Sequence, residues 1–395
     1  MITRIELEGF RSFRDCAVDL SPFTVLVGQN GSGKTNLLEA VDLAAQLIGE
    51  TVVQLRRVSD TAVRWVMPLG PGGDRRGRTI DLFHRFGDGT AGNRIHIAVC
   101  FLHSDPRRGM SHLRLDLDIT RKQATDRPLA DVRLSTAPEV LGRWALNEKQ
   151  QAEIRENTEI MACFEHSNPG ARWYRLVPNA DAARQDTDLH DDQSMARDAH
   201  NLSAVLGRLL GSGEAVHPGA LLLKADAVAV LPGLTDVRSA ADADRGVWEL
   251  DLVYRDAAPT PARLASDGTL HVLSVLTAAH DRDGRGCSTL MVEDVENGLH
   301  PGQVKELVRR LRRCTGPETR QQIIVTTHSP VVLAAVYPAH PGDVLFVDTV
   351  TRVGGGERPS RHSRVRPLAE SGERGTYVPA REARQYLETV QAGSR

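Results

Sequence analysis

Residues 28–35 read GQNGSGKT and match the pattern G-x-x-x-x-G-K-[ST]. The five residues before them, FTVLV, form an apolar run typical of a buried strand, and TNLLEAVDLAAQLIG (residues 35–49) spaces its apolar side chains like a helix. Between a strand and a helix, such a turn directs backbone N–H groups and the helix N-terminus at phosphate oxygens. The sequence therefore predicts an α/β fold around a phosphate-binding loop; the alternative is a chance glycine-rich turn at a helix start.

This loop contains a lysine and a threonine with expected roles. The chain has only five lysines among its 49 basic residues, so a lysine inside the loop stands out. Lys34 would reach the β- and γ-phosphates of ATP as a compact point charge, and the Thr35 hydroxyl would ligate Mg²⁺. The residues expected to bind ATP are Gly28, Asn30, Gly31, Ser32, Gly33, Lys34, Thr35 and Asn36.

Three carboxylates crowd together in LMVEDVENGLHP (residues 290–301), where an apolar run ends. Carboxylates this close repel each other unless a cation lies among them, and a Mg²⁺–nucleotide would supply one. Glu293 would then bind Mg²⁺ directly or through water, Asp294 would orient or deprotonate the attacking water, and Glu296 would lie in the following turn. The alternative is an acidic turn that caps the helix after Pro301.

Two further apolar runs, STLMVED and QIIVTTHS, flank the helical stretch PGQVKELVRRLRRC. Strand, helix and strand in this order predict a parallel core sheet, to which DVLFVD adds a further candidate strand. The second run ends at His328, a residue able to hydrogen-bond a γ-phosphate or the attacking water. A histidine at a strand end can also be purely structural, so both interpretations stay open at this point.

Composition narrows the class of protein. The 395 residues are 41% hydrophobic and 25% charged, as in ordinary globular proteins, and the net charge of -2 means that any DNA contact must come from a local patch. No apolar run approaches the roughly 20 residues of a membrane-spanning helix, so we expect a cytoplasmic protein with no membrane partner. The five cysteines are far apart and read as buried free thiols: Cys16, Cys100, Cys163, Cys287 and Cys314.

Pattern changes along the chain divide it into segments. Alternating strand and turn patterns predict an antiparallel β-lobe after the first helix, and helical patterns predict a compact inserted lobe. Arginines scattered through that lobe could contact DNA, although interleaved acids favour a solvated face. The expected segments are residues 1–104 (phosphate loop and β-lobe), 105–235 (mainly helical insertion), 236–350 (remainder of the ATPase head) and 351–395 (C-terminal extension).

Taken together, these motifs resemble the ABC-class ATPases of the SMC-like and RecF-like branch of the AAA family, including the ATPase half of the OLD (overcoming lysogenization defect) family. The resemblance implies an ABC-type P-loop head with a mixed core sheet, an antiparallel β-lobe and a helical insertion. By resemblance, SDGT is a signature motif that contacts the γ-phosphate of ATP on a second subunit, ENGLHP is the D-loop at the dimer seam, and His328 is the switch histidine. The signature residues are Ser266, Asp267, Gly268 and Thr269, and the D-loop residues are Glu296, Asn297 and His300.

The resemblance further implies an ATP-hydrolysing homodimer that acts as a switch in a bacterial DNA transaction or in anti-phage defence. Only about 65 residues follow His328, too few for the Toprim nuclease domain of OLD proteins, so we expect a separately encoded effector such as a nuclease. One alternative is a RecF-like repair protein that binds DNA in its ATP state. The other is the ATPase subunit of a membrane transporter.

At one point the chain departs from the family pattern. The family usually has Asp-Glu or Glu-Glu at the acidic pair, whereas this chain has Glu293-Asp294. The expected base is therefore one methylene shorter and holds water less closely. This difference predicts slow intrinsic ATP turnover.

Overall fold

The computed structural model describes most of the chain in thirteen stretches. They are residues 1–49, 56–59, 62–68, 79–105, 109–121, 128–137, 144, 146–156, 173–211, 218–281, 288–352, 359–373 and 375–392. Of the cysteines expected to be buried thiols, Cys16, Cys100 and Cys314 are buried and free. Cys163 and Cys287 lie outside the described residues.

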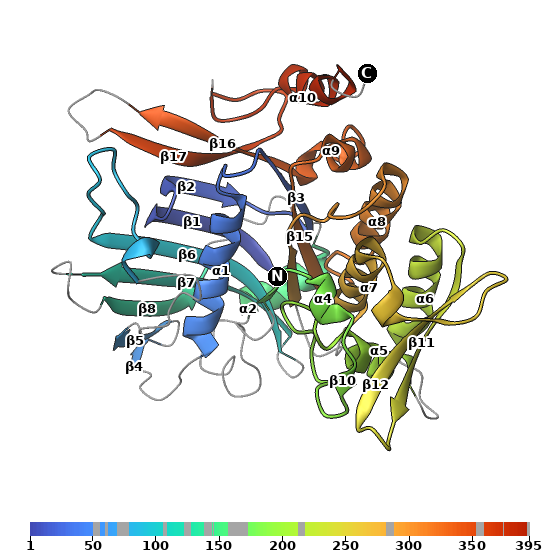
Figure 1. Ribbon diagram of the computed structural model, residues 1–395. Helices are drawn as coiled ribbons and strands as arrows, with labels where there is room; N and C mark the ends of the chain where they lie inside the picture. Colours follow the sequence, from blue (N-terminus) through green and yellow to red (C-terminus); the bar gives the residue numbers. More distant parts are fainter. Residues whose placement is uncertain are drawn as a thin grey trace.

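A six-stranded sheet forms the centre of the molecule, in the order β17-β16-β3-β15-β14-β9 (Figure 1). All neighbouring strands are parallel except β16 and β17. The predicted parallel core sheet is therefore confirmed, and β9 is a strand that the sequence patterns did not indicate. The strand bounds are β3 (Phe23–Val27), β9 (Trp173–Leu176), β14 (Ser288–Val292), β15 (Gln321–Thr327), β16 (Val344–Arg352) and β17 (Ser360–Pro367).

Alternate residues of the parallel strands enter two different hydrophobic cores. Val25 and Val292 pack into a core with the helices on one face, whereas Leu26 and Met291 pack into a core with α1 and the antiparallel sheet on the other. Figure 1 shows α1 between the two sheets and α7 to α9 across the parallel sheet. The bounds of these helices are α1 (Lys34–Gly49), α7 (Asp267–His280), α8 (Pro301–Arg313) and α9 (Pro330–Val336).

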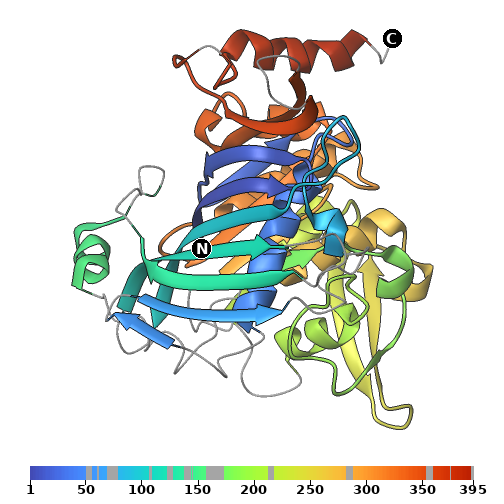
Figure 2. The same cartoon turned by 90° about the vertical axis from the view of Figure 1, so that its left-hand side faces the viewer.

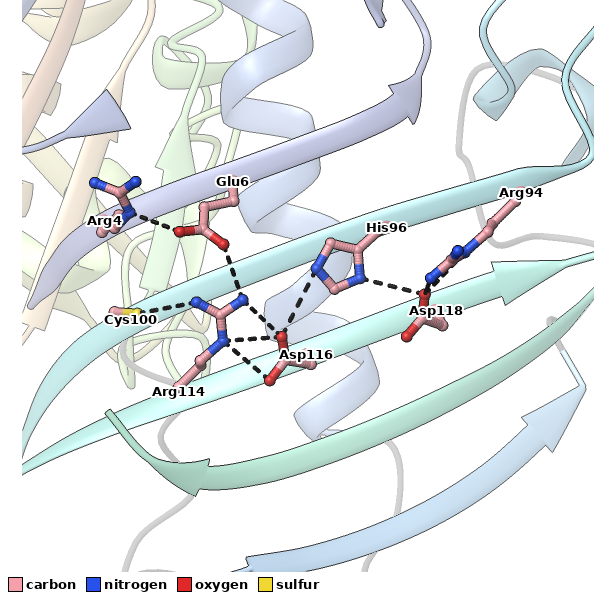
Figure 3. A network of polar contacts seen from close by, with 8 residues as sticks. All are labelled: Arg4, Glu6, Arg94, His96, Cys100, Arg114, Asp116 and Asp118. Carbon is pink, nitrogen blue, oxygen red and sulfur yellow. Dashed lines mark hydrogen bonds and ion pairs between the residues drawn. The ribbon is translucent and has the colours of Figure 1, made fainter. Parts of the chain in front are cut away.

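A seven-stranded antiparallel sheet has the order β2-β1-β6-β7-β8-β5-β4, and Figure 2 shows the face that α1 does not cover. Leucines such as Leu115 and Leu117 face α1, and polar residues between them form a network across β1, β6 and β7 (Figure 3). We call this network the sheet-face ladder; it consists of Arg4, Glu6, Arg94, His96, Arg114, Asp116 and Asp118. The strand bounds are β1 (Ile2–Phe10), β2 (Phe13–Asp19), β4 (Arg56–Ser59), β5 (Ala62–Pro68), β6 (Arg94–Asp105), β7 (Gly109–Thr120) and β8 (Leu129–Thr136); a 3-10 turn, η1, spans Thr79–Leu82.

The insertion expected to be mainly helical at 105–235 differs from the structure. Its first strands, β7 and β8, continue the antiparallel sheet, because their apolar residues alternate with period two; β7 pairs with β6, and β8 pairs with β7. β9 then joins the parallel sheet. The helices described within the range are α2 (Glu148–Glu156), α4 (Ala180–Ala183), α5 (Leu202–Leu210) and α6 (Pro218–Val230).

A small third sheet packs beside α5 and α6, and the chain ends in a helix. The third sheet pairs β10 (Thr187–Asp188), β12 (Val247–Tyr254), β11 (Leu234–Asp242) and β13 (Thr260–Pro261), followed by the turn η3 (Ala262–Leu264). The C-terminal helix is α10 (Ala380–Ala392), and a short turn, η4 (Pro341–Asp343), precedes β16. Among the helices in the described stretches, none is long and apolar enough to cross a membrane.

Candidate functional site

The phosphate loop joins β3 to α1, and α1 begins at Lys34 as the motif predicts. Gly33 has a φ of 108°, and a Cβ at this position would collide with the Ser363 hydroxyl. That hydroxyl donates a hydrogen bond to the Ser32 carbonyl at 2.6 Å and lies 2.8 Å from Ser12 Oγ, within hydrogen-bond distance. The loop is therefore held from beneath by the first hairpin of the chain and by β17.

Two buried groups in the loop are poised for an anion. Lys34 Nζ donates to the carbonyls of Gly28 at 2.7 Å and Gln29 at 3.0 Å. Burial lowers the pKa of Lys34, and the acids of the turn at 293–296 oppose that effect. Ser32 Oγ is buried without a hydrogen-bond partner in the described part of the chain, and an unsatisfied buried hydroxyl is costly. A phosphate oxygen would satisfy the hydroxyl and compete for the ammonium.

Other predicted ATP-binding residues differ in exposure. Asn30 and Gly31 are exposed at the tip of the loop, where Gly31 has a φ of 75°. Asn36 instead points back into the protein and donates to Ser12 Oγ at 2.7 Å. Its side chain therefore supports the loop in this structure.

Thr35 and Glu293, the predicted metal ligands, are in direct contact. Thr35 Oγ1 donates to Glu293 Oε2 at 2.9 Å, and Arg175 contacts the other carboxylate oxygen, Oε1. A hydroxyl and a carboxylate beside a phosphate loop are hard oxygen donors of the kind that Mg²⁺ prefers. The residues present therefore fit a magnesium ion between this pair and a nucleotide.

Asp294 follows at the carboxyl end of β14, with its side chain 49% exposed. Its φ of 44° lies in the left-handed region, which aspartate tolerates better than most residues. Its backbone N–H donates to Thr326 Oγ1 at 3.0 Å, which fixes the turn. His328 Nδ1 lies 3.7 Å from Asp294 Oδ1, so the acid and the histidine face the same space at the edge of the sheet.

Glu296 connects the acidic turn to the loop after β15. Its Oε1 accepts from Thr327 Oγ1 at 2.7 Å and from the backbone N–H groups of His328 and Ser329, each at 3.0 Å. The His328 ring is also 3.3 Å from the same oxygen. Asn297 is exposed. His300 begins α8 as its N-cap, with Nδ1 accepting from the Gly302 N–H at 3.3 Å.

The SDGT stretch opens α7, with Ser266 as the N-cap that accepts from the Thr269 N–H at 3.2 Å. Gly268 packs so closely on Gly298 of the D-loop that a Cβ would collide with the Gly298 carbonyl. Asp267 pairs with Arg184. In the described residues, no hydrogen bond or ion pair joins residues 266–269 to the phosphate loop of the same chain.

Sequence reasoning missed several residues around the site. Arg175 is the main omission, and the signal was a single arginine inside the otherwise apolar WYRL stretch. Thr326 accepts the Asp294 N–H and so fixes the acidic turn, and Glu39 lies 3.3 Å from Arg175. Tyr386 of α10 donates to the His328 carbonyl at 3.1 Å, and no local pattern relates positions so far apart.

Comparison with known proteins gives two family models that follow one another along the chain. Residues 1–166 match the "AAA ATPase domain" family, and residues 160–334 match the family described as "AAA domain, putative AbiEii toxin, Type IV TA system". The chain is 53% identical over 47 residues to the DNA replication and repair protein RecF of Acidothermus cellulolyticus, which is 12% of this chain and 13% of that protein. It is 39% identical over 56 residues to the OLD nuclease of Thermus scotoductus, 14% of this chain and 10% of that protein. These matches thus span only a small part of each relative.

Solved structures with a similar fold include heads of SMC proteins. The SMC head bound to the C-winged helix domain of ScpA has a TM-score of 0.55 at 13% identity, over 93% of this chain and 97% of that one. The SMC head with an extended coiled coil from Pyrococcus furiosus has a TM-score of 0.51 at 12% identity, over 99% of both chains. The fold is therefore an SMC-head-like α/β fold. The two ATPase family models and the phosphate loop together show an AAA-type ATPase, whose short curated matches are to RecF and OLD proteins.

Proposed function

We propose that this ATPase works as a dimeric switch in which two copies enclose two ATP molecules. The observation that carries the proposal is the convergence of Lys34, Thr35, Glu293 and Asp294 at the carboxyl ends of neighbouring parallel strands. Ligands bind at this edge of open α/β sheets. In the part of the chain that the structure describes, no hydrogen bond or ion pair joins the SDGT helix start to its own phosphate loop, which supports a contribution to the site of a second copy.

In this proposal, ATP replaces the internal contacts of the phosphate loop. Lys34 gives up the carbonyls of residues 28 and 29 and pairs with the β- and γ-phosphates, and the Ser32 N–H and hydroxyl bind phosphate oxygens. Asp294 accepts the proton of the attacking water, and His328 hydrogen-bonds the γ-phosphate. The signature residues Ser266–Thr269 of the second copy donate to the same phosphate from the helix start of α7.

Thr35 and Glu293 would hold Mg²⁺ in this arrangement. The ion would neutralise charge on the phosphates when bound. Glu293 is oriented for this role by the Thr35 hydroxyl on one oxygen and by Arg175 on the other.

We further propose that the nucleotide state is relayed to a separately encoded effector, in a DNA transaction or in defence against phage. The family description that mentions a toxin system and the short match to an OLD nuclease support this role. D-loop residue Glu296 binds the His328 loop, so a change at either would move the other.

The decisive experiment measures association and hydrolysis together. Light scattering of the purified protein should show a dimer with Mg²⁺–ATP when Asp294→Asn blocks turnover, and a smaller species without nucleotide. Lys34→Ala should abolish both nucleotide binding and dimerisation. A protein that binds and hydrolyses ATP as a monomer would contradict the switch, and one that ignores ATP would contradict the entire proposal.

A second candidate is a RecF-like role with direct DNA binding, favoured by the match to RecF over 47 residues. It requires affinity for duplex DNA that appears only with ATP and falls steeply with salt. Fluorescence anisotropy of a labelled duplex at two salt concentrations, with and without ATP, separates the two candidates.

A further inference from the structure

Arg175 is an arginine almost completely buried beneath the nucleotide site. It lies on β9, where it is paired in register with Met291 of β14, two residues before Glu293. Its side chain is only 1% exposed. Because strand side chains alternate, Arg175 points to the same face as Trp173, toward α1. A guanidinium at such a position is tolerated only when carboxylates surround it.

Three carboxylates and three arginines form this cluster, which we call the buried charge network. Arg175 contacts Glu293 Oε1 and lies 3.3 Å from Glu39 Oε1 and 3.9 Å from Asp42 Oδ2. Arg11 pairs with Glu39 at 2.6 Å, and Arg197 pairs with Asp42 at 2.9 Å. The charges balance within the cluster, so each arginine has at least one acid of its own.

Within this network, Arg175 distinguishes the two oxygens of Glu293. Nε and Nη2 both contact Oε1, which leaves Oε2 to accept from Thr35 Oγ1 on the side of the phosphate loop. A glutamate has one more rotatable bond than the aspartate common at this position in similar ATPases, so its carboxylate needs an additional constraint. The guanidinium supplies that constraint through two nitrogens held in one plane.

We infer that Arg175 is a positioning residue that fixes Glu293 for Mg²⁺–nucleotide binding, an inference that rests on the proposed role of Glu293. Its strand leads directly into α4, which contacts the signature helix α7, so the same residue joins the metal-binding edge of the site to the inserted part of the chain. Partners that orient a metal ligand commonly change metal affinity by 10–100-fold when removed, that is, by about one to two orders of magnitude.

The test compares Arg175→Met with Arg197→Met. Arg197 belongs to the same network but pairs with Asp42 rather than with Glu293 and is 29% exposed, so it controls for the loss of a network arginine that does not orient Glu293. The affinity of a fluorescent ATP analogue is measured in Mg²⁺ and in EDTA, and ATP turnover is measured as a function of Mg²⁺ concentration. For Arg175→Met we expect about a tenfold weaker affinity in Mg²⁺, an unchanged affinity in EDTA, and a raised Mg²⁺ requirement. Arg197→Met should match the parent protein in all three.

A merely structural role predicts a different pattern. If Arg175→Met loses affinity equally in Mg²⁺ and EDTA, or if Arg197→Met shows the same defect, the inference is wrong. Should Arg175→Met fail to fold, Arg175→Lys serves instead, since it keeps the charge but contacts Oε1 through a single nitrogen. It should show an intermediate Mg²⁺ requirement, and parental behaviour would overturn the inference. A parent protein that binds no ATP would instead contradict the proposed function.

Discussion

The buried charge network and the sheet-face ladder use the same chemistry in different surroundings. Arg175 in the network is 1% exposed, whereas Arg94 in the ladder is 59% exposed and pairs with Asp118 at 2.8 Å. The paired charges of the ladder (Figure 3) are all partly exposed, so water competes for them, whereas the guanidinium beside Glu293 is almost completely buried. The difference teaches that exposure, more than the length of an ion pair, decides its energetic weight.

Asp294→Asn should change ATP turnover strongly while leaving stability almost unchanged. We expect turnover to fall by about 10²–10⁴-fold, because the amide cannot accept the proton of the attacking water. Stability should barely change, since this side chain is half exposed. Phosphate release at saturating Mg²⁺–ATP and thermal unfolding measure the two effects. Parental turnover in the variant would remove Asp294 from the chemistry.

Glu39→Gln tests how much the buried charge network contributes to stability. Glu39 pairs with Arg11 at 2.6 Å and lies 3.3 Å from Arg175, and an amide removes the negative charge that faces both guanidinium groups. Removing one partner of a buried pair costs about 3–5 kcal/mol, so the free energy of unfolding should fall by that amount. Chemical denaturation checks the value. A loss as small as that of an exposed pair would show that water enters the network.

Gly268→Ala gives a loss of stability without any change of charge, against which the losses in the two networks can be compared. The added methyl group would collide with the Gly298 carbonyl, which forces α7 away from the D-loop. Overpacking of this kind costs about 1–3 kcal/mol. Thermal unfolding should place this variant between Glu39→Gln and variants of the ladder. Unchanged stability would mean that α7 and the D-loop separate easily.

Asp294→Glu asks whether the short acid limits the rate. If the missing methylene holds water too far away, restoring it should raise turnover by about tenfold, which corresponds to about 1.4 kcal/mol. Single-turnover hydrolysis measures the chemical step directly. If the variant is no faster than the parent protein, the expectation that the Glu293-Asp294 order makes turnover slow is wrong.

Glu6→Gln should have the smallest effect. Although partial burial opposes the shift, hydrogen bonds from Arg114 and Arg4 hold the pKa of Glu6 below its ordinary value of 4.5. The contribution is therefore present at neutral pH and is lost as the pH falls through and below that value. We expect a loss of about 0.2–1 kcal/mol at pH 7 that shrinks as the pH is lowered well below 4.5. Denaturation across that pH range checks it, and a larger loss at pH 7 would erase the contrast with Glu39.

Local sequence patterns predicted the parallel sheet and the phosphate loop, because each depends on residues within one strand, turn or helix. Thr35 and Glu293 were expected to meet at a metal ion, and the structure brings them into contact. Arg175 was missed because its partners lie on α1 and β14, far away in sequence. The strands β7 and β8 were assigned to a helical insertion, since a boundary was placed at a turn within a continuous sheet.

The hydroxyl of Ser363 supports the phosphate loop from 331 residues further along the chain. A nascent polypeptide therefore carries the whole GQNGSGKT motif long before it contains the group that holds this motif in shape. Contacts of such long sequence separation form late and slowly. The loop therefore gains this hydrogen bond only once β17 has been synthesised.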